Sequence, residues 1–151
     1  MTQQAVNTIA DQRQTIEDLE TPVLEVWDGI LALPLIGSVD TRRAQKMNER
    51  LLQRIVETGS EIVLVDISAV PVVDTAVSRH LLETVTAARL LGAEVIIVGL
   101  TAATAMTLVQ LGESLSGVTT KTTMAKGLQL AMRQMGYVVS REAASGFVSP
   151  A

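Results

Sequence analysis

The apolar residues of this 151-residue chain follow two alternating patterns. Short continuous apolar runs are typical of strands that are buried on both faces. Between these runs, apolar residues recur every three or four positions, which is typical of a helix with one buried face. These patterns predict strands over residues 23–27, 30–35, 61–67, 94–98 and 117–120, and helices that begin near residues 40, 74, 101 and 122.

Turn and cap residues separate the predicted elements. Asp28-Gly29 joins the first two apolar runs, and an Asp-Gly link between such runs indicates a hairpin. Gly59, Gly92 and Gly112 follow three of the predicted helices, where glycine commonly ends a helix. Strands that alternate with helices imply right-handed crossovers. We therefore expect one α/β domain, in which a mainly parallel sheet has an N-terminal hairpin and about four helices.

A polar stretch precedes the hairpin. Within it, Ile9, Gln12, Ile16 and Leu19 are spaced by three and four, which predicts a helix with a thin apolar stripe. Such a helix is too short to be stable alone, so we expect it to pack against a second copy or against the domain. The chain is thereby divided into a linker or dimerisation helix over residues 1–20, a domain over residues 21–139 and a flexible tail over residues 140–151.

Composition narrows the possible partners and the location. Hydrophobic residues make up 48% of the chain and aromatic residues only 2%, which predicts an aliphatic core. The net charge of −4 argues against nucleic acid and anionic membranes as partners. The chain has no cysteine, no apolar run near the roughly 20 residues that span a bilayer, and no N-terminal signal pattern. We expect a cytoplasmic protein.

No set of catalytic or metal-binding residues stands out. His80 is the single histidine, and we interpret it as a surface or structural residue. Ser78 and His80 lie two positions apart on one predicted helix and do not face each other, so with Asp74 they do not form a triad. Asp66 and Asp74 flank a loop without a third ligand. The sequence also lacks the common glycine-rich phosphate motifs. We expect no enzymatic activity, no cofactor and no metal.

The stretch over residues 64–77 is the most distinctive segment. A buried strand brings the chain to the carboxyl edge of the sheet, where ligands and partners commonly bind in open α/β folds. Asp74 is expected to cap the following helix, with the hydroxyl of Thr75 exposed in the first turn. A phosphate on Thr75 would be attracted by the helix N-terminus and repelled by Asp74, which would change the surface with little refolding. The partner-binding residues expected here are Asp66, Ser68, Asp74, Thr75 and Ser78.

This segment resembles the signature of STAS domains, which have the SpoIIAA-like fold of anti-sigma factor antagonists. The resemblance lies in the order Asp66-x-Ser68-x-Val70-Pro71 followed by Val73-Asp74-Thr75. It is closer to stressosome STAS proteins of the RsbR and RsbS type, and it extends over residues 20–137. Further segments that carry it are Thr21-Pro22-Val23, Val26-Trp27-Asp28-Gly29, Leu33-Pro34-Leu35-Ile36-Gly37, Ala88-Arg89-Leu90-Leu91-Gly92-Ala93 and Leu111-Gly112.

The resemblance implies a phosphorylated scaffold. Thr75 matches the first kinase target of the family. Thr107 resembles the second target, and Thr104 is the other candidate for it. It is equally consistent with the sequence that Thr107 is an ordinary threonine on the surface of a helix. Such STAS domains form homodimers, assemble with RsbS-like paralogues and sequester an RsbT-like serine/threonine switch kinase. Stress triggers phosphorylation and release of the kinase, which frees a stress sigma factor further downstream.

The chain departs from the RsbR pattern at its start. RsbR-type chains carry a sizeable N-terminal sensor domain, whereas only residues 1–20 precede the domain here. RsbS-type chains are shorter still and usually have serine at the first phosphorylation site. Thr75 and the predicted N-terminal helix therefore favour the RsbR side, and the chain is either a relative without a sensor or a fragment.

Two other functions fit the same pattern. One is a simple anti-sigma factor antagonist that binds an anti-sigma kinase one-to-one and does not form large assemblies. The other is a STAS domain that senses a small ligand or carries an enzymatic activity, which the missing catalytic set disfavours. The size of the assembly separates the scaffold from the antagonist, and a thermal-shift screen with nucleotides and lipids tests for a ligand.

Overall fold

The computed structural model describes residues 22–111, 117–138 and 140–141. The predictions for residues 1–20 and for most of the tail lie outside the described residues. The predicted order of elements is confirmed. The elements are β1 (Leu24–Trp27), β2 (Ile30–Ile36), α2 (Thr41–Thr58), β3 (Ile62–Ala69), α3 (Thr75–Leu90), β4 (Glu94–Val98), α4 (Ala102–Leu111), β5 (Thr119–Lys121) and α5 (Met124–Gln134).

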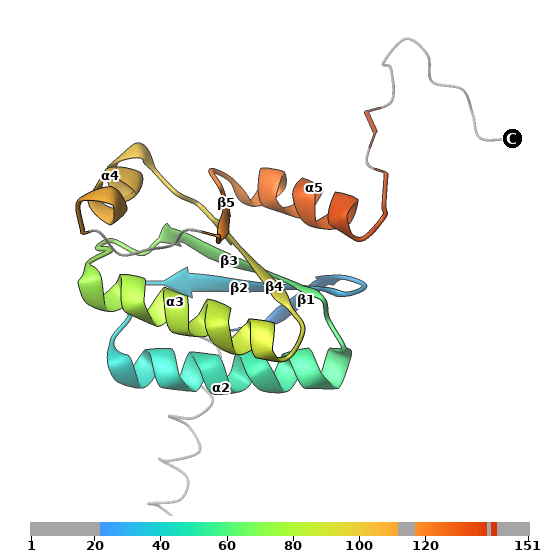
Figure 1. Ribbon diagram of the computed structural model, residues 1–151, viewed down its shortest axis with the longest axis horizontal. Coiled ribbons are helices and arrows are strands. Elements are labelled where there is room, and N and C mark those ends of the chain that lie inside the picture. Colours follow the sequence, from blue (N-terminus) through green and yellow to red (C-terminus); the bar gives the residue numbers. More distant parts are fainter. Residues whose placement is uncertain (1–21, 112–116, 139, 142–151) are drawn as a thin grey trace, which may run out of the picture.

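The five described strands form one sheet in the order β1-β2-β3-β4-β5. β1 pairs with β2 antiparallel through the predicted hairpin, and the remaining neighbours pair in parallel. Helices α2 and α3 lie on one face of the sheet and α5 lies on the other, as Figure 1 shows. The carboxyl ends of β3, β4 and β5 therefore meet at one edge, from which α3, α4 and α5 begin.

β3 and β5 differ most from their predicted bounds, because of their neighbours. β3 continues to Ala69, into the predicted loop, because Ala69 pairs with Ile36 and its carbonyl accepts a hydrogen bond from the backbone N–H of Gly37. β5 covers Thr119–Lys121 instead of residues 117–120, since its register is set by pairing with the end of β4. Neither pairing can be predicted from the residues of one strand, because each joins segments that are distant in sequence.

The helix ends follow their cap residues. The side chain of Asp40 accepts a hydrogen bond from the backbone N–H of Arg43 at 2.8 Å, and α2 ends at Gly59 in the left-handed conformation. Thr123 caps α5, and its hydroxyl oxygen accepts a hydrogen bond from the backbone N–H of Lys126 at 3.1 Å. In both α2 and α5, the N-cap side chain therefore accepts a hydrogen bond from the backbone N–H three residues further along the chain.

The core is aliphatic, as predicted, and is divided by the sheet into two clusters. Alternate residues of β3 face opposite sides, so Val63 and Val65 join the larger cluster while Ile62 and Leu64 join the smaller one. The larger cluster is covered by the apolar faces of α2 and α3. The smaller one is covered by α5, whose Ala131 is fully buried. β3 is thus enclosed on both faces.

α5 packs close to the sheet because it carries a glycine at the contact. A Cβ atom added at Gly127 would overlap the Cγ1 atom of Val98 and would lie 3.3 Å from the Cδ2 atom of Leu64. Neither neighbour can move freely, because both belong to the buried sheet. The absence of a side chain at Gly127 therefore sets how near α5 lies to β3 and β4.

We expect Gly127→Val to lower the free energy of unfolding by about 2 kcal/mol, because the new side chain pushes α5 away from the sheet. Urea denaturation measures the change. The matched control is Ala125→Val, which places the same side chain on the exposed side of the same helix. Equal stability of the two variants would show that the close approach is not required.

Among the described residues, no helix combines the length and the apolar character that crossing a bilayer requires.

Candidate functional site

The candidate site is the loop between β3 and α3, at the carboxyl edge of the sheet. Val70 and Val73 are buried against the larger core cluster, and the backbone N–H of Val70 donates to the carbonyl of Ile67 at 3.1 Å. Between these two anchors, Pro71 and Val72 are exposed, Val72 with 64% of its surface accessible. The loop is therefore held at both ends and presents an apolar tip.

Asp66 and Ser68 lie near the end of β3, where the pairing with β2 is irregular. The Oδ1 atom of Asp66 accepts a hydrogen bond from the backbone N–H of Ser68 at 2.9 Å. Asp66 is half-buried and Ser68 is exposed. Asp66 lies in the predicted strand, whereas Ser68, predicted in the following loop, belongs to β3.

Gly99, which follows β4, lies against Asp66 and Ser68. Its φ of +85° favours glycine, and an added Cβ atom would lie 2.6 Å from both the Oδ1 atom of Asp66 and the backbone N of Ser68. This contact was not predicted from the sequence. The available signal was a glycine directly after a buried strand, at the same edge as the site.

Asp74 caps α3, as predicted. Its Oδ1 atom accepts a hydrogen bond from the backbone N–H of Val77 at 2.9 Å, and its carbonyl accepts from the backbone N–H of Ser78. Thr75 is then the first residue of α3, and it is exposed. Asp74 and Thr75 thus lie beside each other at the positive end of the helix dipole.

Ser78 does not lie at the surface. Only 1% of it is accessible, and its hydroxyl is buried without a hydrogen-bond partner among the described residues. The prediction that Ser78 contacts a partner is therefore wrong in this conformation. The reason is its position on α3: it lies beside Val77 and one turn from Leu81, on the side that packs into the protein.

The two candidate threonines of α4 are half-buried. The hydroxyl of Thr107 donates to the carbonyl of Ala103 at 3.0 Å, while Thr104 accepts a hydrogen bond from the hydroxyl of Thr101 at 3.0 Å. The hydroxyl oxygen of Thr101 also accepts a hydrogen bond from the backbone N–H of Thr104, so this N–H in the first turn of α4 has a partner. Both hydroxyls have local partners, and the choice between Thr104 and Thr107 stays open.

His80 is structural and buried, with 8% of its surface accessible. Its ring nitrogens have no hydrogen-bond partner among the described residues, and Nδ1 lies 3.8 Å from the carboxylate of Glu83. Of the two expected roles, surface or structural, the burial of His80 fits the structural one. In the part of the chain that the structure describes, no group of three or more His, Cys, Asp or Glu is placed to hold a metal.

Comparison with known proteins identifies the class. The model of the STAS domain family matches residues 21–126, which include every element from β1 to β5 and end within α5. The chain belongs to the STAS domain family. Its relatives within that family place it with the stressosome STAS proteins of the RsbR and RsbS type.

The RsbT co-antagonist protein RsbRA of Bacillus subtilis (strain 168) is 41% identical over 125 residues, which are 83% of this chain and 46% of that protein. A blue-light photoreceptor of Listeria monocytogenes is 32% identical over 76% of this chain and 45% of that protein. The chain thus spans less than half the length of these curated relatives.

Solved structures show the same relationship. A variant of RsbS from Moorella thermoacetica is similar with a TM-score of 0.67 and 31% identity, over 78% of this chain and 98% of that one. A chain from a structure described as the molecular architecture of the stressosome has a TM-score of 0.62 and 29% identity, over 77% of this chain and all of that one.

We expect Asp74→Ala to lower the free energy of unfolding by about 1 kcal/mol, because the backbone N–H of Val77 loses its acceptor. Asp74→Asn keeps a side-chain oxygen at this place and is expected to stay close to the unchanged protein. Urea denaturation compares the two variants. If both lose the same stability, the charge of Asp74 matters and its capping hydrogen bond does not.

Proposed function

We propose that this chain is a non-enzymatic scaffold of a stressosome-type complex. In this role it binds paralogous STAS proteins and a serine/threonine switch kinase, is regulated by threonine phosphorylation and controls a stress sigma factor pathway. The observation that carries the proposal is the exposed Thr75 at the start of α3, which follows a loop with buried ends. The similarity to an RsbT co-antagonist protein supports the type of partner.

The surroundings of Thr75 support a switch that acts through the surface. A phosphate adds a charge of about −1.5 to −2 at neutral pH. The helix N-terminus attracts that charge, while the carboxylate of Asp74 repels it. The anchors Val70 and Val73 and the cap of α3 do not involve the Thr75 side chain. Phosphorylation therefore changes the charge that a partner meets and leaves the fold in place.

The partner surface consists of the accessible residues at this edge. Asp66 and Ser68 belong to the end of β3, Asp74 and Thr75 to the start of α3, and the exposed Val72 lies between them in the chain. Its carboxylates and apolar tip are suited to a partner with both cationic and apolar side chains. Phosphorylation of Thr75 would add to the negative charge on this surface and alter the affinity for such a partner.

Incubation with a switch kinase of the RsbT type and ATP is expected to phosphorylate Thr75, and mass spectrometry locates the phosphate. The Thr75→Ala variant should lose this modification. The control Thr86→Ala removes an exposed threonine on the same helix and should keep it. Separate variants of Thr104 and Thr107 show which of them is a second site. Phosphate elsewhere with none on Thr75 contradicts the proposal.

We also propose that residues 1–20 contribute to a homodimer through the stripe of Ile9, Ile16 and Leu19. Deletion of these residues is expected to weaken self-association, which sedimentation velocity measures as a shift toward the monomer. The control replaces the polar Gln3 and Gln4 by Ala and should change nothing. Unchanged self-association after the deletion would show that the stripe makes no dimer contact.

A further inference from the structure

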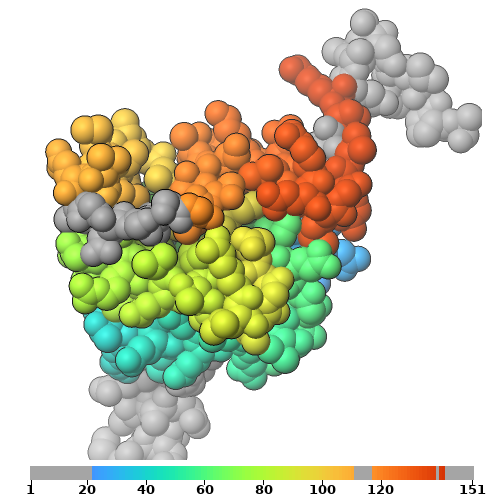
Figure 2. All heavy atoms as spheres, in the orientation of Figure 1, coloured from blue at the N-terminus to red at the C-terminus, as the bar shows by residue number. Residues whose placement is uncertain are grey.

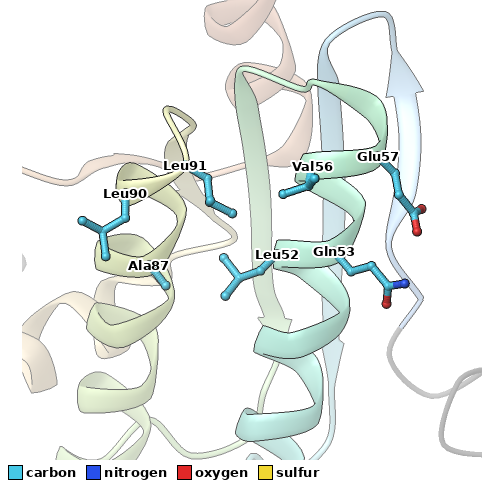
Figure 3. Close-up of a pocket in the computed structure, with 7 residues that line it drawn as sticks. All are labelled: Leu52, Gln53, Val56, Glu57, Ala87, Leu90 and Leu91. Atoms are coloured by element: carbon cyan, nitrogen blue, oxygen red, sulfur yellow. The ribbon is translucent and has the colours of Figure 1, made fainter.

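Two hollows on the surface of the described residues differ in their chemistry. The larger has a volume of about 530 Å³ and lies between α2 and α3, and Figure 3 shows the apolar Leu52 and Leu91 pointing into the gap between these helices. Among the residues that line it, only Glu57 is charged, and Glu57 is paired with Arg54 at 3.3 Å. This hollow therefore has few polar groups that would orient a ligand.

The smaller hollow lies against the end of β5 and the outer side of α5, and its volume is about 230 Å³. It is lined by three cationic side chains, an amide and a leucine, which are Lys121, Lys126, Arg133, Gln129 and Leu130. Figure 2 shows α5, coloured orange to red, at the surface of the molecule. Lys126 and Arg133 are two turns apart on α5, and Lys121 is the last residue of β5. Two elements thus bring three cations to one cationic hollow.

These cations are concentrated in one part of an acidic chain. Residues 114–141 contain four Lys or Arg and no Asp or Glu, so the rest of the chain has a net charge of −8 within the total of −4. Within the described residues, none of the three cations of the hollow makes an ion pair. By contrast, every Lys and Arg of α2 has a partner. The cationic hollow therefore has a positive charge that the described carboxylates do not offset.

Lys126 lies at a place where a cation is unfavourable for folding. It is in the first turn of α5, which contains no acidic residue. The N-terminus of a helix carries a partial positive charge, so a lysine there lowers the stability of the helix. The backbone N–H of Lys126 is already satisfied by Thr123, which leaves the ammonium group without a counter-charge. A bound anion would interact favourably with both the ammonium group and the helix end.

We infer that the cationic hollow binds a small phosphate monoester. The planar guanidinium of Arg133 suits two phosphate oxygens at once, and the ammonium groups of Lys121 and Lys126 act as point charges. The side-chain amide of Gln129 supplies a further donor, and Leu130 offers an apolar contact to the organic part of the ligand. The volume is below the roughly 300 Å³ at which pockets for drug-sized ligands begin, so the ligand must be small.

The charge of the whole chain favours a small anion over a nucleic acid. Charges in solution are screened beyond about 8 Å at physiological ionic strength. A phosphate monoester in the hollow would therefore interact mainly with the three cations beside it. An extended polyanion would also meet the carboxylates that give the rest of the chain its charge of −8.

The cationic hollow is separate from the proposed phosphorylation site. α5 lies on the opposite face of the sheet from α3, the helix that begins with Thr75. Binding of a phosphate monoester does not rest on the scaffold function, so either proposal can fail without the other.

An NMR titration of the full chain with glycerol 3-phosphate at constant ionic strength tests the site. The backbone amide signals of Lys126 and Gln129 are expected to shift and to reach saturation. Lys126→Gln and Arg133→Gln should each raise the dissociation constant by at least about fivefold, because each removes one charged contact. The control Arg79→Gln removes an exposed cation from α3 and should leave the constant unchanged. Shifts without saturation, or an equal loss in the control, overturn the inference.

Two further titrations test the class of ligand. Inorganic phosphate is expected to bind more weakly than glycerol 3-phosphate, because it lacks the organic part that would contact Leu130. Equal affinity for the two overturns the assignment to a monoester. A short DNA duplex is also expected to bind more weakly. Tighter binding of the duplex through Lys126 and Arg133 overturns the inference in favour of a nucleic-acid surface.

A charge reversal separates binding from stability. Lys126→Glu is expected to raise the urea concentration at the midpoint of unfolding, because it places a carboxylate at the positive end of the helix dipole. The same variant should lose the saturable binding of glycerol 3-phosphate. Retained binding contradicts the inference, as does a lower midpoint, which would show that Lys126 supports the fold.

Discussion

The burial of β3 on both faces is the constraint on which the rest of the molecule depends. Its residues Ile62–Val65 alternate between the two core clusters, and β2 and β4 flank it in parallel. A strand enclosed in this way has little freedom to shift, since a slip by one residue would exchange its two faces. Its carboxyl end, which includes Asp66 and Ser68, therefore has a defined position.

Close packing around the sheet makes the site compact. Gly99 lets the end of β4 lie against Asp66 and Ser68 of β3, and Gly127 lets α5 lie against β4. Both close approaches are possible because glycine has no side chain. A larger residue would overlap backbone or buried atoms, which cannot move away. The edge that carries Thr75 is thus a rigid platform on which a change of charge can act without a change of fold.

The two ends of α3 and the cationic hollow of α5 present different chemistry. The first turn of α3 carries the capped Thr75 at the sheet edge, where partners of the family are expected to bind. Its last turn carries the exposed Leu90. The cationic hollow lies on the opposite face of the sheet, so a phosphate monoester bound there leaves Thr75 accessible.

The sequence by itself determined the order of elements, the aliphatic core, the cap at Asp74 and the exposure of Thr75, because these follow from spacing along the chain and from contacts within a few residues. The family, too, was recognisable from the residues around Asp74. Only the tertiary structure decided that Ser78 is buried, that Gly99 touches Asp66 and that β3 extends to Ala69. Each of these depends on which segments, distant in sequence, pack together. The exposure of Leu90 also required the structure, since spacing alone does not show which apolar residues of a helix remain uncovered.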